Sequence, residues 1–218
     1  MNLKIKNALI SVSDKQDLTL ILKVLKKFNI KIISSGGTYT SIEKLGYQCT
    51  ELSKYTGFKE MLDGRVKTLH PKIHAGILHD RHNKKHKNEM SKQNFPPIDL
   101  IIVNFYPFQK IVLNTNDSKN IIENIDIGGP TMVRAAAKNF NNVTIITSKS
   151  DYGSLIKELE YNKGKTSLKF RELMSSKAFG LTAYYDAMIA NWFNKKLKIN
   201  FPERKTIFGR KFKELRYG

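Results

Sequence analysis

The sequence is poor in cysteine and has no long apolar run. Cys49 is the single cysteine among 218 residues, so no disulfide can form within the chain. A lone thiol without metal-ligand spacing indicates a reduced compartment. No segment approaches 18 consecutive apolar residues, and residues 1–6 lead into an apolar run without the uncharged core of a signal peptide. We therefore predict a cytoplasmic protein without a membrane partner.

Acidic residues are also scarce, with 19 Asp and Glu against 38 Lys and Arg and a formal net charge of +19. Such a balance is typical of nucleic-acid binding, which stays an alternative with a steep salt dependence. The basic residues are scattered, however, and no recognition-helix or aromatic-platform motif accompanies them. Their densest run, Lys84-Lys85-His86-Lys87, is expected in a surface loop. We predict no nucleic-acid partner and expect the charge to attract anionic metabolites.

The hydrophobic content of 40% supports a sizeable core. Short β-branched runs alternate with helical patterns, which indicates parallel βαβ units. We predict an α/β fold, a parallel sheet flanked by helices in three layers, with a helical C-terminal extension. The expected strands cover residues 8–12, 31–34, 48–52, 99–104 and 143–147, and the expected helices cover 15–28, 38–45, 131–138 and 167–196. Ser13 or Asp14 is expected to cap the first helix, and Gly180 to break or bend the last.

Two of the expected strands end in segments suited to a phosphate. Ser11-Val12-Ser13-Asp14-Lys15 offers hydroxyls, backbone amides and an ammonium, and Ser35-Gly36-Gly37-Thr38 allows close backbone approach and positive φ angles. Ligands of parallel sheets bind at such strand ends. For either segment alone, a tight turn with hydroxyl caps is the simpler interpretation. Their occurrence at successive strand ends favours a binding site.

Further candidate residues lie beyond these two segments. Arg65 suits a bidentate anion contact and Lys67 a compact charge, and their spacing predicts both on one side of an extended loop. Tyr106 follows a buried strand, so its hydroxyl is expected at the same edge of the sheet. Asp126 precedes a Gly-Gly-Pro helix start, and Lys138 falls in the last turn of that helix, although the helix dipole alone explains both. His70 and His74 lack a third ligand cluster, so we predict no metal site.

These segments resemble the inosinate (IMP) cyclohydrolase domain of the bifunctional purine-biosynthesis enzyme, which has a methylglyoxal-synthase-like fold. The resemblance also includes the runs Tyr55-Thr56-Gly57-Phe58, Ala75-Gly76-Ile77-Leu78, Asn104-Phe105-Tyr106-Pro107-Phe108 and Arg134-Ala135-Ala136-Ala137-Lys138-Asn139. It implies a nucleotide-binding core over residues 1–147 and a helical extension over 148–200. Residues 201–218 resemble the start of a linker to a formyltransferase domain that this chain does not contain.

The resemblance implies that the chain closes the purine ring of 5-formamidoimidazole-4-carboxamide ribonucleotide (FAICAR), giving IMP and water. Lys138 would transfer the proton, which requires a pKa lowered by burial beside cations such as Lys67, and Asp126 would orient it or the carboxamide. Lys67 and Tyr106 would position the substrate and stabilise charge on oxygen. The substrate-binding residues implied are Ser11, Ser13, Asp14, Lys15, Ser35, Gly36, Gly37, Thr38, Arg65, Val66, Thr68, Val103, Asn104, Ile127, Gly128 and Gly129.

The resemblance also implies the partners. The ligand would be a nucleotide monophosphate, FAICAR or IMP, and ring closure needs no cofactor. A formyl donor, 10-formyltetrahydrofolate, would serve only the second domain, and the full-length protein would form a homodimer. The same core resembles methylglyoxal synthase and the regulatory domains of carbamoyl-phosphate synthetase. A phosphate-ligand-binding regulatory module without catalysis is therefore the alternative.

Overall fold

A five-stranded parallel sheet forms the centre of the computed structural model, which describes residues 2–213 and 215. The strands are β2 (Asn7–Ser11), β3 (Lys31–Ser34), β4 (Thr50–Glu51), β5 (Leu100–Val103) and β6 (Thr144–Ile146), and their order is β4-β3-β2-β5-β6. The five strands predicted from the sequence are confirmed, with ends shifted by two residues at most. The reversal of order beside β2 opens the sheet edge where the site lies.

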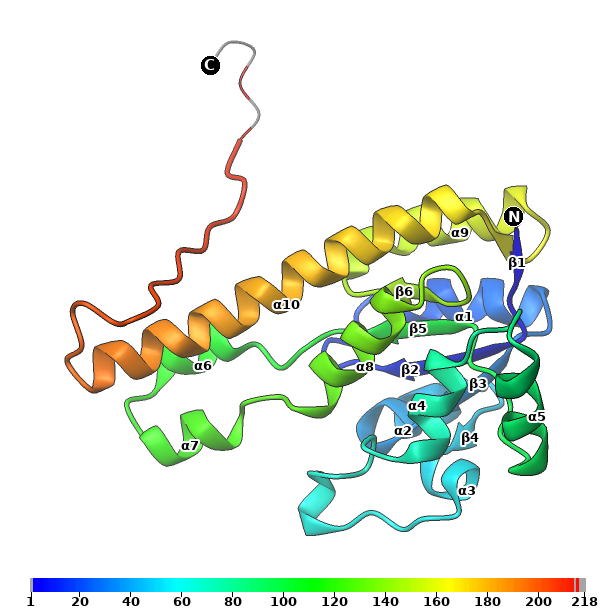
Figure 1. The fold of residues 1–218 in the computed structure, drawn as a ribbon, viewed down its shortest axis with the longest axis horizontal. Helices are drawn as coiled ribbons and strands as arrows, with labels where there is room; N and C mark the ends of the chain where they lie inside the picture. The colour runs from blue at the N-terminus through cyan, green and yellow to red at the C-terminus, as the bar shows by residue number, and fades with distance from the viewer. Residues whose placement is uncertain (1, 214, 216–218) are drawn as a thin grey trace.

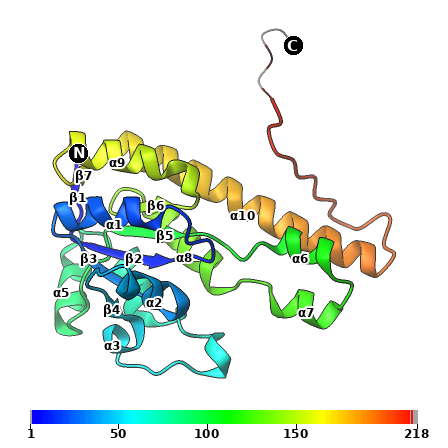
Figure 2. The same ribbon diagram turned by 180° about the vertical axis from the view of Figure 1, so that it is seen from behind.

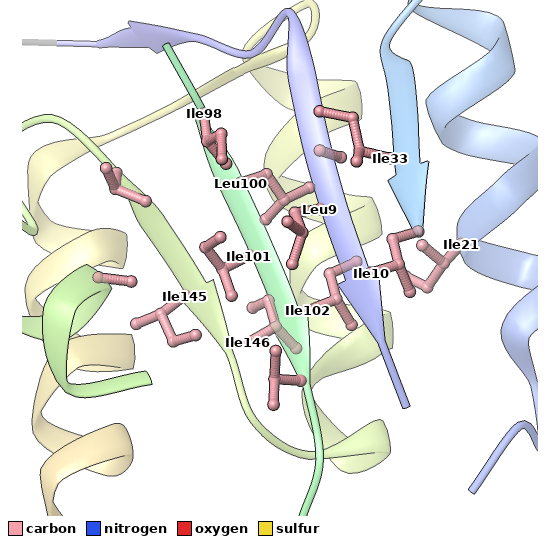
Figure 3. Close-up of a cluster of buried hydrophobic side chains, with 14 of the residues drawn as sticks. Leu9, Ile10, Ile21, Ile33, Ile98, Leu100, Ile101, Ile102, Ile145 and Ile146 are labelled. Carbon is pink, nitrogen blue, oxygen red and sulfur yellow. The ribbon is translucent and has the colours of Figure 1, made fainter. Parts of the chain in front are cut away.

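The central strands are apolar on both faces because helices cover both. All four residues of β5 are buried, and Leu9, Ile101 and Ile145 contribute side chains to the same core (Figure 3). Such continuous apolar runs are typical of parallel sheets. Residues in register across β2 and β5, such as Leu9 and Ile101, lie side by side in this core.

Helices form a layer on each face of the sheet. Helices α4 (Pro71–Leu78) and α8 (Gly128–Lys138) lie on the face seen in Figure 1, and α1 (Leu18–Lys27) lies in front of the strands in the reverse view of Figure 2, packed with α9 (Tyr152–Tyr161). The remaining shorter helices are α2 (Gly36–Lys44), α3 (Leu52–Thr56), α5 (Lys84–Lys92), α6 (Phe108–Asn114) and α7 (Ser118–Glu123), with 3-10 turns η1 (Leu62–Gly64) and η2 (Lys149–Asp151). The predicted α/β fold in three layers is confirmed.

The C-terminal third is dominated by one long helix, α10 (Leu168–Lys196), which crosses α8 and β6. The Ser167 side chain accepts a hydrogen bond from the Phe170 amide and caps its start. The helix runs through Gly180 without a break, so the expected interruption there is wrong. Its far half extends beyond the sheet and packs with α6 (Figure 1), around the buried side chains of Phe108, Ile121 and Tyr185.

Two local predictions are wrong for identifiable reasons. Ser13 and Asp14 do not cap helix α1, because they belong to the loop after β2 and the helix begins only at Leu18. The residue before it, Asp17, has a left-handed backbone (φ 61°) and makes no side-chain cap. The basic run that begins at Lys84 lies on helix α5, since the Asn83 side chain accepts hydrogen bonds from the amides of Lys85 and His86.

The two ends of the described chain add little to the sheet. Strand β1 (Leu3–Lys4) pairs antiparallel with β7 (Lys165–Thr166), a pairing that the sequence analysis did not predict. Residues 201–213 and 215 have no regular helix or strand, and the remainder of the expected linker lies outside the described residues. Within the part of the chain that the structure describes, no helix is long and apolar enough to cross a bilayer.

Candidate active site

A cavity of about 830 Å³ opens at the carboxyl ends of strands β2, β3 and β5. Ser11 ends β2, Ser35 follows β3 and Val103 ends β5, and all three line the cavity. Loops at this edge lead into helix N-termini, which is why parallel sheets bind ligands here. The volume lies within the range of small-molecule sites, about 300–1,000 Å³. The structure brings most of the predicted residues into this wall: Ser11, Ser13, Lys15, Ser35, Gly37, Thr38, Arg65, Lys67, Thr68, Val103, Asn104, Tyr106, Asp126, Ile127, Gly128 and Gly129.

The loop after β2 is fixed by side chains from neighbouring strand ends. The Ser13 amide and hydroxyl both donate to Asn104 Oδ1, at 2.7 and 2.8 Å, and the hydroxyl also lies 2.9 Å from the Phe105 carbonyl. Thr38 Oγ1 accepts from the Val12 amide (3.1 Å) and donates to the Val12 carbonyl (2.9 Å). These hydroxyls hold the backbone, so the loop presents a fixed surface to the cavity.

Two ammonium groups converge on the N-terminus of α2. The Nζ atoms of Lys67 and Lys15 lie 3.5 and 3.6 Å from the points where Cβ atoms of Gly36 and Gly37 would stand. Gly36 has φ +52°, a conformation that favours glycine. The first hydrogen bond of the helical pattern runs from the Tyr39 amide to the Ser35 carbonyl, at 3.3 Å. The backbone amides before Tyr39 therefore lie at the positive end of the helix dipole. We call these four residues, Lys15, Gly36, Gly37 and Lys67, the anion cradle.

Asp126 is held at the start of α8, in the wall of the same cavity. Its Oδ1 accepts from the Gly129 amide at 2.8 Å. Burial raises the pKa of Asp126, although the backbone amides of Gly129 and Tyr106 and the charge of Lys67 oppose the shift. A Cβ at Gly129 would stand 2.6 Å from Asp126 Oδ2, so glycine is required for this approach. The site therefore contains a partly buried carboxyl next to a cation.

Arg65 is paired with an acidic residue across the cavity wall. Its Nε lies 3.1 Å from Glu123 Oε1, and its Nη2 bonds the other carboxylate oxygen. Both side chains are more than half exposed and both line the cavity. This ion pair connects the segment after η1 to α7, two segments that are 58 residues apart in the sequence. The guanidinium predicted to hold the ligand is thus neutralised by a carboxylate.

Three of the predicted binding residues lie outside the cavity wall. Asp14 is exposed, lies 2.9 Å from Lys149 Nζ and accepts from the Gln16 amide, which lowers the pKa of its carboxyl. Val66 lies in a turn, where its carbonyl accepts from the Leu69 amide. The predicted extended loop is therefore wrong, although Arg65 and Lys67 both reach the cavity. Gly36 lines a smaller adjoining pocket of about 150 Å³.

Lys138 is the main correction to the predicted catalytic set. It is exposed at the last turn of α8, whereas the cavity lies at the first turn of that helix. At about 1.5 Å per residue, ten residues separate Lys138 from Gly128 by about 15 Å along the axis. The burial beside Lys67 that the hypothesis requires is absent. Lys138 does not line the cavity of this chain.

The sequence analysis missed four residues of the wall, which lie outside its candidate segments: Ile122, Glu123, Ile125 and Met132. Glu123 carried one usable signal, since it is an acidic residue three positions before Asp126. No spacing rule relates it to Arg65, because loops bring the two together. Among the described residues, no group of three or more His, Cys, Asp and Glu side chains is placed to hold a metal ion.

Comparison with known families supports the fold. The model of the MGS-like domain matches residues 17–131, which is more than half of the chain. The chain belongs to the MGS-like domain family. The matched MGS-like part contains the anion cradle residues Gly36, Gly37 and Lys67 and the carboxyl of Asp126. Residues 136–218 match a second family model, that of the AICARFT/IMPCHase bienzyme.

Similar curated proteins are longer than the chain. The bifunctional purine biosynthesis protein PurH of Bradyrhizobium diazoefficiens is 46% identical over 215 residues, which is 99% of this chain and 41% of that protein. PurH of Leptospira biflexa is 46% identical over 217 residues, 99% of this chain and 42% of the relative. The chain thus spans about two fifths of the length of the curated relatives it matches.

A solved structure shares the fold. The crystal structure of ForH has a TM-score of 0.77 and 30% sequence identity, covering 87% of this chain and 99% of that one. The curated relatives named above are biosynthetic proteins, so they do not support the alternative of a regulatory module without catalysis.

Proposed function

We propose that this chain is an IMP cyclohydrolase domain, which closes the purine ring of FAICAR to give IMP and water. The anion cradle carries this proposal, because two ammonium groups at a helix N-terminus suit the phosphate of a nucleotide monophosphate. The relatives that match the whole chain are purine biosynthesis proteins, which favours this nucleotide over other phosphorylated ligands.

Ring closure joins the carboxamide nitrogen to the formyl carbon. One proton leaves the carboxamide nitrogen, one leaves the formamido nitrogen, and both end on the former formyl oxygen, which departs as water. An amide nitrogen is a weak nucleophile, and the intermediate places negative charge on oxygen. The reaction therefore benefits from a base near the carboxamide and from a cation near that oxygen.

Asp126 is the base of this proposal. Burial raises its pKa, which makes the ionised carboxyl a better proton acceptor than an exposed aspartate. The hydrogen bond from the Gly129 amide fixes its direction. Lys67, the cradle residue whose charge acts on Asp126, supplies the cation near that oxygen. The half-exposed Tyr106 side chain covers the base end of the cavity.

Binding at the cradle would supply orientation. With the phosphate held between Lys15 and the first amides of α2, the imidazole end extends toward Asp126, which lines the same cavity. Holding both reacting groups in one molecule in a fixed pose removes much of the entropic barrier. The reaction needs no cofactor in this proposal, and the formyl donor, the second domain and the homodimer remain expectations for the longer relatives.

A spectrophotometric ring-closure assay tests the proposal with the wild-type chain, Lys67→Ala and Lys157→Ala. Lys157 is an exposed lysine on α9 that controls for loss of charge. We expect turnover by the wild type, unchanged kinetics for Lys157→Ala and a kcat/KM about 10- to 150-fold lower for Lys67→Ala, since a charge-assisted hydrogen bond contributes about 1.5–3 kcal/mol. Tight nucleotide binding without turnover would overturn the proposal in favour of a regulatory module.

A further inference from the structure

The long C-terminal helix reaches the candidate base. The backbone amide of Asp126 donates a hydrogen bond to the hydroxyl of Tyr185 at 2.8 Å. Tyr185 lies in the middle of α10, 59 residues away in the sequence, and is only 2% exposed. Since the residues matched by the MGS-like domain end at 131, this contact comes from a part of the chain outside that domain.

Aromatic packing fixes the ring of Tyr185. Its centroid lies 5.0 Å from that of Phe105 and 6.1 Å from that of Phe108 in tilted and edge-on arrangements. Phe108 also packs edge-on against Trp192, about two turns further along the same side of α10. Such pairs add stabilisation beyond simple burial, so the phenol is held rather than free to rotate.

Both backbone segments that hold the Asp126 carboxyl therefore contact Tyr185. The first is Asp126 itself, through its amide. The second is the loop after β5, because Phe105 packs on the Tyr185 ring and precedes Tyr106, whose backbone amide acts on the pKa of the carboxyl. A single side chain of α10 thus contacts both the backbone of Asp126 and the loop that lies beside its carboxyl.

We infer that Tyr185 is a positioning residue for ring closure, which aims the Asp126 carboxyl into the cavity by holding both segments. This inference rests on the proposed function. The phenol does not line the cavity, so it acts through Asp126 and not on the substrate. On this reasoning the helical extension is a component of the active site, because it supplies a contact to Asp126 that the nucleotide-binding core lacks.

The substitution Tyr185→Phe isolates the role of the hydroxyl. It keeps the ring and its packing, and it leaves the Asp126 amide without this acceptor. A misplacement of about 1 Å can reduce a rate about 100-fold. We expect kcat to fall about 10- to 100-fold while KM changes less than about threefold, because the anion cradle lies at the start of α2 and Tyr185 does not line the cavity.

Tyr184→Phe is the matched control. It removes a hydroxyl from the preceding residue of the same helix, whose ring packs against Phe208 and beneath Arg210. Kinetics are measured together with amide hydrogen exchange, read by NMR at Asp126, at Gly129 and on strand β5. In Tyr185→Phe we expect exchange at least about tenfold faster at Asp126 and Gly129 with unchanged protection on β5, since only the local hydrogen bond is lost. Tyr184→Phe is expected to match the wild type in both measurements.

The two measurements separate the inference from the proposed function. If the wild type closes no ring, the proposed function fails, and the exchange data still decide whether Tyr185 positions Asp126. If Tyr185→Phe equals Tyr184→Phe in kcat and in exchange, the inference is overturned. Should Tyr185→Phe not fold, 3-fluorotyrosine at position 185 keeps the packing and weakens the acceptor. The same changes are then expected at smaller size, and their absence overturns the inference.

Discussion

Neutralising Glu123 is expected to strengthen nucleotide binding. In the structure Glu123 holds the Arg65 guanidinium by two hydrogen bonds and adds a negative charge to the wall of a cavity that suits an anion. Glu123→Gln removes that charge with little change of shape. Arg65 is then available to the phosphate, which binds guanidinium groups well.

The exposure of Glu123 limits the magnitude. For an assumed separation of about 8 Å, a unit charge contributes about 0.5 kcal/mol at the dielectric constant of water and about 2 kcal/mol at an effective value of 20. We expect a gain near 1 kcal/mol, or about fivefold in Kd. Both partners of the ion pair are more than half exposed, so the loss of fold stability should stay below about 1 kcal/mol.

Isothermal titration calorimetry with IMP measures this change, with Glu89→Gln on α5 as the control for net charge. Glu89 is exposed and does not line the cavity. The gain for Glu123→Gln should shrink as salt is raised, because exposed charges are screened. A Kd that is unchanged, or raised, in Glu123→Gln at low salt would refute the reasoning, since the carboxylate would then not compete with the ligand.

Three further predictions concern the Asp126 side of the site. Gly129→Ala would place a Cβ 2.6 Å from Asp126 Oδ2 and should lower stability by about 1–3 kcal/mol in urea unfolding, whereas Gly180→Ala, which meets open space within α10, should raise it by up to about 1 kcal/mol. Burial raises the pKa of Asp126 in the folded chain above its ordinary value of 3.8. Between the ordinary and the raised pKa the folded chain binds more protons than the unfolded chain, so stability falls as pH rises through that range. Asp126→Asn should therefore melt at a higher temperature than the wild type at pH 7, with the difference fading toward pH 4; an equal difference at both pH values would contradict the assigned shift. Lys138→Ala should retain ring-closure activity, and a large loss of kcat would show that the lysine reaches the site by a route absent from a single chain.

Local signals in the sequence predicted the fold well. Apolar runs such as residues 99–104 predicted the strands, because a strand covered on both faces must be apolar throughout. The segments at successive strand ends predicted the cavity, because topology brings such ends together. Strand β7 was missed because two residues carry no periodicity, and the helix through Gly180 was misjudged because tertiary packing on α8 outweighs one glycine.

The contacts that complete the site could not be predicted from spacing. Lys138 was assigned through the family resemblance, and its distance from the cavity follows only from the direction of α8. The Glu123 carboxylate and the Tyr185 hydroxyl reach the site from α7 and α10, and their partners lie 58 and 59 residues away. Such pairings depend on three-dimensional packing, so sequence periodicity contains no record of them.

The central claim is that one cavity holds the phosphate at the anion cradle and closes the ring at Asp126. The most direct test compares kcat/KM of the wild-type chain for the formylated ribonucleotide and for the same nucleoside without its phosphate. With two ammonium contacts at about 1.5–3 kcal/mol each, the nucleotide should be preferred at least about 100-fold. Equal values for the two substrates, or turnover of neither, would contradict the account.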